Sequence, residues 1–310
     1  GTPLSLSPSV GISVLPDDGY SPDELLRHAA AAMHYAKEGG RGTHLFYAPY
    51  MLGQPAEALQ QEHLLRAAVP QDALRLHAPG LGVAGLTALG AEMGSAEMMT
   101  HARLANTHKP QLRTHDRFGH RTDVVEFHPS YHALMGAALR HGLHATPWSR
   151  QDTGHAHVER AAGFMLFTEA EPSILCPVSM SYAVTPALRG NAAVWADWNK
   201  GLTSTQYDPR LALFSQKSAL TMGMGMTEKQ GGSDVRANTT QAVPDGDDAW
   251  GARYRITGHK WFFSAPMCDA FLVLAQAPGG LTCFFLPRVL PDDKVNAIRI
   301  QRLKDKLGNH

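Results

Sequence analysis

The pattern of apolar and polar positions changes twice along the chain and divides it into three regions. Residues 1 to about 50 alternate as a strand, a helix and a second strand. Residues 59–211 show the three- and four-residue spacing of helices, and the chain from about 215 onward has short apolar runs bounded by glycine and proline. The expected fold is therefore a multidomain α+β chain with domains at 1–50, 59–212 and 213–310 and a linker at 51–58.

The first region contains a clear helix-start signal between two expected strands. Residues 10–15 predict the first strand and residues 43–47 the second. Ser21, Pro22 and Glu24 occupy the positions of an N-cap, a first helical residue and a capping-box partner. Small apolar residues then recur at helical spacing.

The second and third regions differ in the period of their apolar residues. Helical spacing in the second is carried by Leu86, Leu89 and Met93 and by Tyr131, Leu134, Met135 and Ala138. We expect several helices joined by ordered loops, with a first helix starting near Ala56. Beyond residue 215 the alternating and aromatic runs predict antiparallel β-structure.

Composition narrows the classes of function. The 310 residues are 44% hydrophobic and 18% charged, which excludes a disordered chain. Equal numbers of acidic and basic residues give no overall field for nucleic acid or anionic lipid. There is no apolar run long enough for a membrane span and no signal-peptide pattern. Three widely spaced cysteines fit a reducing cytoplasm, so a cytoplasmic location is expected.

Histidines do not form a predicted metal site. The pairs His141/His144 and His155/His157 lack a supporting cluster of ligands, and there is no Cys-x-x-Cys pair. We therefore interpret them as surface or core histidines and expect no metal.

The segment from Met222 to Asp234 is the most unusual stretch. It lacks the third glycine of a dinucleotide fingerprint and the Gly-Lys-Ser/Thr of a phosphate loop. What remains is a glycine-dense loop with hydroxyls at Thr227 and Ser233. Such a loop lets the backbone approach a flat or phosphorylated ligand, and the hydroxyls can bind its oxygens. An ordinary turn is an equally good interpretation from these residues alone.

A second segment follows about 30 residues later. Trp261, Phe262 and Phe263 precede Ser264 and Pro266, an arrangement suited to a wall against a flat ring. Taken alone, the interpretation as sheet core is stronger.

At this spacing the two segments resemble the flavin-binding middle domain of the acyl-CoA dehydrogenase family, and specifically its AidB-like adaptive-response flavoproteins. Residues 225–235 and 299–309 are similar to signatures of that group. Upstream similarities to its helical region lie at 104–106, 112–116, 127–132 and 175–180. The resemblance covers about 59–310 and implies an all-α N-terminal domain followed by an antiparallel β-barrel.

The resemblance also implies FAD as cofactor and removal of hydrogens from Cα and Cβ of an acyl-CoA. The FAD-contacting residues carried over are Met224, Gly225, Met226, Thr227, Glu228, Lys229, Gln230, Gly231, Gly232, Ser233, Phe262, Phe263 and Ser264. Thr227 and Ser233 would also contact substrate, an acyl-CoA-like small molecule. Glu228 is interpreted as structural.

The sequence departs from the family in two respects. The catalytic base of the family is expected on a C-terminal helical domain, so no catalytic residue is assigned here and the chain is expected to be an inactive fragment with a truncated barrel. The family is also associated with DNA, but Arg299, Arg302, Lys304 and Lys306 form only a short basic cluster. DNA binding by this chain is not expected; a homo-oligomer is possible.

Residues 9–47 resemble the C-terminal end of a GGDEF domain, the diguanylate cyclase module. Lys37 and Arg41 match positions that contact GTP phosphates in that family, although compensation of the helix dipole explains them equally well. The GGDEF signature and its metal-binding carboxylates are missing, so no cyclase activity is expected. Two families thus meet near residue 55. The simplest hypothesis is a fragment or a fused reading frame. One alternative is a signalling fusion that binds a guanine nucleotide. The other is a DNA-protecting flavoprotein without turnover.

Overall fold

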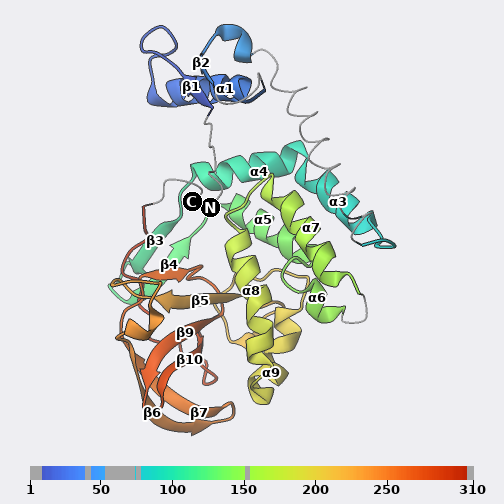
Figure 1. Cartoon of the computed structure of the whole chain (residues 1–310). Coiled ribbons are helices and arrows are strands. Elements are labelled where there is room, and N and C mark those ends of the chain that lie inside the picture. The colour runs from blue at the N-terminus through green and yellow to red at the C-terminus, as the bar shows by residue number, and fades with distance from the viewer. Residues whose placement is uncertain (1–8, 39–42, 53–73, 75–77, 151–153, 306–310) are drawn as a thin grey trace, which may run out of the picture. The chain divides into compact units, whose positions relative to one another are not determined.

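The computed structural model describes residues 9–38, 43–52, 74, 78–150 and 154–305. The chain divides into two compact units, Gly1–Val69 and Pro70–His310, each with its own internal contacts. Figure 1 shows the elements of both units. The helix expected from Ala56 lies outside the described residues.

The first unit is a β-α-β arrangement. Strand β1 (Val10–Ile12) pairs in parallel with β2 (His44–Phe46), and α1 (Pro22–Glu38) connects them before a short 3₁₀ turn, η1 (Pro49–Leu52). The expected cap of α1 is confirmed: Glu24 N donates to Ser21 Oγ at 3.2 Å, and Tyr20 N donates to the Glu24 carboxylate at 3.1 Å. Strand β1 is shorter than expected because its ladder with β2 spans three residues.

In the first unit the helix lies directly on the sheet. A Cβ added to Gly11 would stand 1.9 Å from Ala29 O, so only glycine fits beneath the helix. Ala32 and Ala36 are fully buried, which matches the predicted helical spacing of small residues. This packing explains why the apolar face of α1 is built from alanine.

The second unit begins with a layer of helices. In chain order these are α3 (Ala84–Met93), α4 (Ala96–Thr107), α5 (Pro129–Arg140), α6 (Thr146–Ser149), α7 (Ala156–Thr168), α8 (Leu175–Leu188) and α9 (Ala192–Leu202). The predicted apolar stripe of α3 is confirmed by the burial of Leu86, Leu89 and Met93. Leu134 and Met135 of α5 are likewise buried, in a core shared with α4, α7 and α8.

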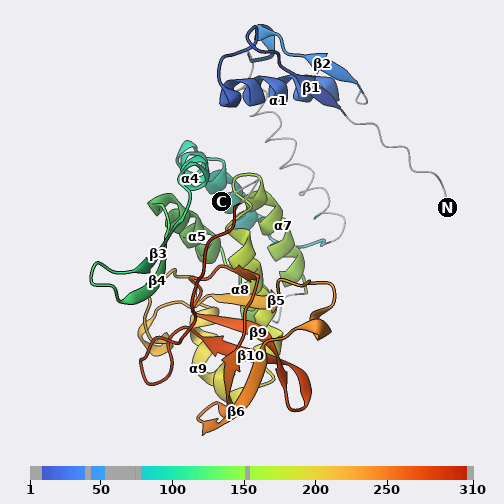
Figure 2. The ribbon, with the colours of Figure 1, turned by 90° about the vertical axis from the view of Figure 1, so that its left-hand side faces the viewer.

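The expectation of helices alone in this region is wrong. A β-hairpin lies between α4 and α5, formed by β3 (Gln111–His115) and β4 (Arg121–Glu126), and it projects from the helical layer (Figure 2). Its turn is closed by Asp116, whose side chain accepts from Phe118 N and His120 N, with Gly119 at φ 85°. Period-two burial along both strands is the physical signal that distinguishes them from helices.

The last part of the chain forms a six-stranded sheet. Its strands are β5 (Met222–Thr227), β6 (Gln241–Asp248), β7 (Gly251–Thr257), β8 (Phe262–Ser264), β9 (Ala270–Ala277) and β10 (Gly280–Pro287). The order is β7-β6-β9-β5-β8, with β10 also paired to β9. The 3₁₀ turns η2 (Phe214–Gln216) and η3 (Val235–Ala237) flank β5.

The sheet is mixed rather than wholly antiparallel, which corrects the sequence-based expectation. Strand β9 pairs in parallel with β5 and, at Gln276, with β6, whereas β10 pairs antiparallel along its other edge. Parallel pairing arises because β6, β7 and β8 lie between β5 and β9 in the chain and allow a crossover. Where a barrel was expected, the described residues form one mixed sheet with β9 at its centre.

Apolar packing and one buried hydrogen bond fix the sheet against the helices. Trp198 of α9 is fully buried with Met222, Ala270 and Leu272 of the sheet. Met222 N donates to Ser181 Oγ of α8 at 2.9 Å. These contacts position β5, the strand that carries the unusual glycine-rich motif, at the boundary between helices and sheet. Within the described residues, no helix combines the length and apolar character needed to cross a membrane.

Candidate functional site

The two segments singled out in the sequence adjoin in the structure. Strand β5 pairs antiparallel with β8, placing Met224 opposite Ser264 and Thr227 opposite Phe262. Trp261 N donates to Thr227 O at 2.9 Å, which extends the pairing beyond β8. The edge formed by β5, β8 and the loop after β5 is called the β5–β8 edge below.

The glycines inside β5 serve packing rather than approach to a ligand. A Cβ on Gly223 would lie 2.6 Å from the Phe271 ring, and one on Gly225 would lie 2.5 Å from the Phe263 ring. Both rings belong to a small core within the sheet, so the glycines admit them. This finding changes the interpretation of the glycine-rich segment: half of its glycines are explained by aromatic neighbours.

Methionines alternate with these glycines on the opposite face of β5. Met224 and Met226 are partly buried against the core that contains Val184 and Trp198 of the helices. The strand therefore turns its methionines toward α8 and α9 and its glycines toward the sheet interior, as period-two geometry requires.

The loop after β5 is anchored by Glu228. Its carboxylate is buried and accepts from Lys260 Nζ at 2.8 Å, from the backbone N and hydroxyl of both Thr239 and Thr240, and from Gln230 Nε2 at 2.8 Å. Burial opposes its ionisation, but the hydrogen bonds from Lys260 and Thr240 prevail and lower the pKa of Glu228 below its usual range. Glu228 is therefore an ionised anchor of this loop and not a free proton acceptor.

Three hydroxyls at the β5–β8 edge have no protein partner within the described part of the chain. Thr227 is half-buried, with its side chain beside Gly232, where an added Cβ would lie 3.1 Å from Thr227 Cγ2. Ser233 is exposed on the same loop, and Ser264 is partly buried at the end of β8. Lys229, Gln230, Gly231 and Gly232 are exposed around them. The edge thus offers donors and acceptors that the fold itself does not use.

The aromatic segment contributes one ring to the surface and one to the interior. Phe262 is 56% exposed, whereas the Phe263 ring packs on Phe271 with centroids 4.4 Å apart. Phe263 therefore does not form a ligand wall beside Phe262. Lys304 Nζ lies 3.0 Å from the Phe262 ring centroid and 4.3 Å from that of Trp261. The basic segment that the sequence offered as a possible DNA contact here covers the aromatic surface.

A cavity of about 350 Å³ begins immediately after Ser264. It lies between β4, α5, the loop before η2 and the β8–β9 connection. Its lining residues are Val124, Val125, Glu126, Phe127, Tyr131, His132, Met135, Pro177, Tyr207, Asp208, Pro209, Leu211, Thr221, Ala265, Met267, Cys268 and Arg288. The size falls within the range of small-molecule sites. The cavity could not be predicted from the sequence, because its lining comes from six separate stretches of chain.

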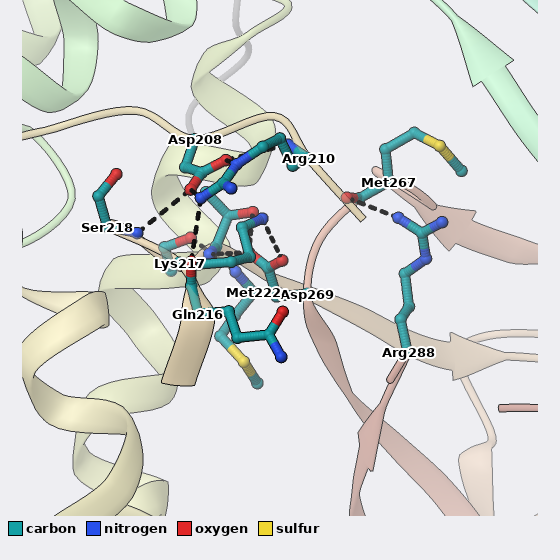
Figure 3. Close-up of polar contacts among 11 residues, drawn as sticks. Asp208, Arg210, Gln216, Lys217, Ser218, Met222, Met267, Asp269 and Arg288 are labelled. Atoms are coloured by element: carbon teal, nitrogen blue, oxygen red, sulfur yellow. Dashed lines mark hydrogen bonds and ion pairs between the residues drawn. The ribbon is translucent and has the colours of Figure 1, made fainter. Parts of the chain in front are cut away.

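Polar groups beside this cavity form paired charges (Figure 3). Lys217 Nζ lies 2.5 Å from Asp269 Oδ1, and Thr221 N donates to Asp269 Oδ2 at 2.8 Å. Burial raises the pKa of Asp269 despite Lys217. Asp208 accepts two hydrogen bonds from the Arg210 guanidinium, at 2.9 and 2.6 Å, which lower its pKa although burial opposes ionisation.

Within the cavity itself, hydrogen bonding and burial modify other titratable groups. His132 Nδ1 and the Tyr207 hydroxyl are 2.9 Å apart. Burial lowers the pKa of His132 and raises that of Tyr207. Burial also raises the pKa of the Cys268 thiol to about 12, so this cysteine stays protonated.

Other residues singled out in the sequence are not part of this site. Lys37 is exposed in the last turn of α1, and Arg41 lies outside the described residues, as does Lys306. His141 Nε2 lies 2.8 Å from Glu92 Oε2, and His157 Nδ1 lies 2.6 Å from the Tyr182 hydroxyl. These contacts account for the histidines as structural groups, and the described residues contain no cluster of three or more metal-ligating side chains.

Comparison with known proteins accounts for the helical layer and the sheet. The family model of the adaptive response protein AidB N-terminal domain matches residues 54–209, half of the chain. The model of the acyl-CoA dehydrogenase middle domain matches residues 223–310. The chain belongs to the AidB branch of the acyl-CoA dehydrogenase family. AidB of Escherichia coli (strain K12) is 49% identical over 227 residues, which cover 72% of this chain and 41% of that protein. The chain thus spans less than half of this relative.

Solved structures agree with this family assignment. The structure described as Bd2924 apo-form covers 82% of this chain and 50% of its own, with a TM-score of 0.65 and 30% identity. Caenorhabditis elegans ACDH-11 in complex with C11-CoA covers 77% of this chain and 42% of its own, with a TM-score of 0.63 and 25% identity. The helical N-terminal and β middle domains of the family are therefore present.

A short segment is similar to a different class of protein. The cyclic di-GMP phosphodiesterase NbdA of Pseudomonas aeruginosa is 39% identical over 77 residues, which cover 25% of this chain and 10% of that protein. The GGDEF domain itself is not shown by this similarity.

Proposed function

We propose that this chain binds FAD at the β5–β8 edge as an AidB-type member of the acyl-CoA dehydrogenase family. The observation that carries the proposal is the set of three hydroxyls, of Thr227, Ser233 and Ser264, that have no partner among the described residues and lie beside the exposed Phe262 ring. A flat ring with a polar rim is the ligand that such a combination fits, because the ring stacks on the aromatic face and its oxygens and nitrogens bond the hydroxyls.

Each residue of the edge has a distinct role in this proposal. Thr227, opposite Phe262, and Ser264, opposite Met224, lie on the paired strands and hold the ring edge, while Glu228 and Lys260 fix the loop that presents Ser233. Backbone groups of Met224–Gly232 complete the contact. When bound, FAD supplies the acceptor for a hydride; the protein supplies position and polar contacts.

We propose an acyl-CoA as the second ligand, with Thr227 and Ser233 touching it. The support is the family assignment together with the cavity that starts next to Ser264, whose walls include Val125, Phe127 and Met135. An aliphatic chain fits such a surface because burial removes its CH₂ groups from water. The family reaction is oxidation of the Cα–Cβ bond by removal of the α-proton and transfer of the β-hydride.

No base for the α-proton is proposed among the residues of this site. Glu228 is the carboxylate nearest to Thr227 in sequence, and its hydrogen bonds to Lys260, Thr239, Thr240 and Gln230 keep it ionised and occupied. We therefore propose that the chain binds FAD and acyl-CoA without measurable turnover on its own. DNA contact is not part of the proposal, because Arg302 and Lys304 lie over the Trp261 ring.

The test is the visible absorbance of the purified chain after FAD is added and free FAD is removed by gel filtration. A retained flavin band that is lost in a Thr227→Ala/Ser233→Ala double variant supports the proposal. Thr100→Ala/Thr107→Ala on α4 is the matched control, since both threonines are exposed and bond only to carbonyls of their own helix. A folded, colourless wild-type chain, or equal retention in both double variants, would refute binding at this edge.

We further propose that residues 1–50 derive from the C-terminal end of a GGDEF domain, joined through 51–58 to the AidB-like parts at 59–212 and 213–310. The parallel β1-α1-β2 unit and the 77-residue similarity support this descent. Lys37 and Arg41 are the residues to test for a guanine nucleotide. A GTP-induced shift in the melting temperature of wild type, absent in Lys37→Ala, is the result that this minor proposal requires.

A further inference from the structure

The cavity next to Ser264 contains a charge that has no ion-pair partner among the residues that the structure describes. Arg288 lines it, and its Nη1 donates to the Met267 carbonyl at 3.0 Å (Figure 3). Its backbone N donates to Asp269 O at 2.8 Å, which fixes the residue at the end of β10. Among the described residues, no carboxylate lies within ion-pair distance of its guanidinium. A guanidinium has five N–H donors, so most of them are not used by the protein bonds seen here.

The other charges around Arg288 compensate one another. Asp208 is paired with Arg210, Asp269 with Lys217, and Glu126 at the cavity rim with Arg113 at 3.0 Å. Each acid therefore has its own cation. Arg288 is left as one net positive charge in a partly buried place, which costs free energy unless an anion or ordered water meets it.

Most of the remaining cavity wall is apolar, and these other polar side chains in it have protein partners: His132 with Tyr207, Asp208 with Arg210, Glu126 with Arg113 and Thr221 with Asp269. Met267 and Ala265 lie on the β8–β9 connection, and Met135, Phe127 and Leu211 come from the opposite side. A cation in a mainly apolar chamber, whose other charged side chains are paired within the protein, selects a ligand with one anionic end and a hydrocarbon body. A planar carboxylate matches the guanidinium fork better than a neutral group does.

We propose that this cavity binds a carboxylate attached to a short aliphatic chain, with Arg288 holding the carboxylate. Two sources offer the same chemistry: a free short-chain fatty acid, and the terminal carboxyl of a dicarboxylic acyl thioester. Only the thioester source rests on the proposed function. The site accounts for the uncompensated Arg288, which FAD binding at the β5–β8 edge does not explain.

The first experiment is calorimetric titration of the whole chain with hexanoate at pH 7.5, with 1-hexanol as the neutral ligand of equal length. Hexanoate is expected to bind saturably, and butanoate to bind about tenfold more weakly because two fewer CH₂ groups are buried. Arg288→Gln is expected to weaken hexanoate binding at least tenfold and to leave 1-hexanol unchanged. Arg302→Gln, an exposed arginine over Trp261, is the control and retains wild-type binding.

A second variant keeps the test decisive if Arg288→Gln does not fold. Leu211→Trp enlarges a side chain at the cavity rim that is already 42% exposed, so folding is preserved while the chamber narrows. It is expected to weaken hexanoate binding severalfold. Absence of saturable hexanoate binding to wild type overturns the proposal, as does binding unaffected by either variant.

The two sources are separated by comparing adipyl-CoA with hexanoyl-CoA. Tighter binding of adipyl-CoA that is lost in Arg288→Gln assigns the site to the dicarboxylic thioester. Equal binding of the two thioesters, with hexanoate still dependent on Arg288, assigns it to the free acid. A colourless chain in the FAD experiment would refute the proposed function and leave the hexanoate result standing, so the two failures are distinguishable.

Discussion

Two buried carboxylate–lysine pairs in the sheet region have opposite electrostatic outcomes. Glu228 and Lys260 meet at 2.8 Å beside β5 and β8, and the pKa of Glu228 is lowered. Asp269 and Lys217 meet at 2.5 Å beside the cavity, and the pKa of Asp269 is raised. Burial opposes ionisation in both. The difference lies in the number of donors. Glu228 accepts from two threonines and a glutamine besides its lysine, whereas among the described residues the Asp269 side chain accepts only from Thr221 besides its lysine.

The comparison teaches that a lysine partner alone does not decide the ionisation of a buried acid. The carboxylate lone pairs must also be satisfied, because the desolvation penalty is repaid only when they are. At the β5–β8 edge the sequence supplies these donors within one loop and its neighbours. Beside the cavity, Asp269 has fewer hydrogen-bond donors, so its surroundings stabilise the ionised carboxylate less.

Removing the lysines should show the largest difference between the pairs. Lys217→Met leaves Asp269 buried with little compensation and is expected to lower the free energy of unfolding by about 3–5 kcal/mol. Lys260→Met leaves Glu228 its remaining donors and is expected to cost about 1–3 kcal/mol. Urea denaturation of both variants measures the two losses. Lys294→Met, on an exposed lysine, is the control without measurable loss, and equal losses at positions 217 and 260 would contradict the explanation.

Packing of the glycine-rich strand is the next effect in size. Gly225→Ala forces a methyl group against the Phe263 ring and is expected to lower the free energy of unfolding by about 1–3 kcal/mol. Gly279→Ala in the β9–β10 turn has open space around its Cβ and is the control. Thermal or urea unfolding measures both. If Gly225→Ala leaves the free energy of unfolding unchanged, packing against Phe263 does not explain this glycine, and close approach of a ligand to the backbone does.

The contributions of Glu228 and Asp269 to stability should change in opposite directions as the pH rises. Because the folded pKa of Glu228 is lowered, its contribution is complete above the ordinary value of about 4.3 and is lost as pH falls below it. Because the folded pKa of Asp269 is raised, stability declines instead as pH rises from about 3.9 through that raised value. Urea unfolding between pH 3 and 7 should show a shallower acid loss in Glu228→Gln and a smaller decline with rising pH in Asp269→Asn. Parallel profiles for both variants and wild type would argue against opposite shifts.

The smallest expected effect concerns the cover over the aromatic surface. Lys304→Ala removes the cation above Phe262, and FAD binding should tighten about two- to fivefold because an exposed cation–π contact no longer competes. Lys294→Ala is the matched control. Fluorescence quenching of FAD measures the affinity, and weaker binding in Lys304→Ala would mean that this lysine assists the ligand rather than covering its place.

Much of the local structure could be predicted from the chain because its signals lie within one element. The Ser21–Glu24 capping box and the stripe of Leu86, Leu89 and Met93 both follow from neighbouring residues. The β3–β4 hairpin was missed because its strands are short and lie among helices. The mixed sheet was missed because parallel pairing of β5 with β9 is a contact between residues nearly 50 positions apart.

The sequence by itself determined the family, the approximate order of helical and β regions, and the choice of the Met222–Ser233 and Trp261–Ser264 segments as one candidate site. Only the tertiary structure decided which faces those segments present. It turned Phe263 and the β5 glycines inward, placed Lys304 over Phe262, and gathered Arg288, Asp269 and Lys217 from distant positions. The physical reason is that short-range patterns specify backbone conformation, whereas the burial and pairing of a charge depend on which remote residues the fold brings beside it.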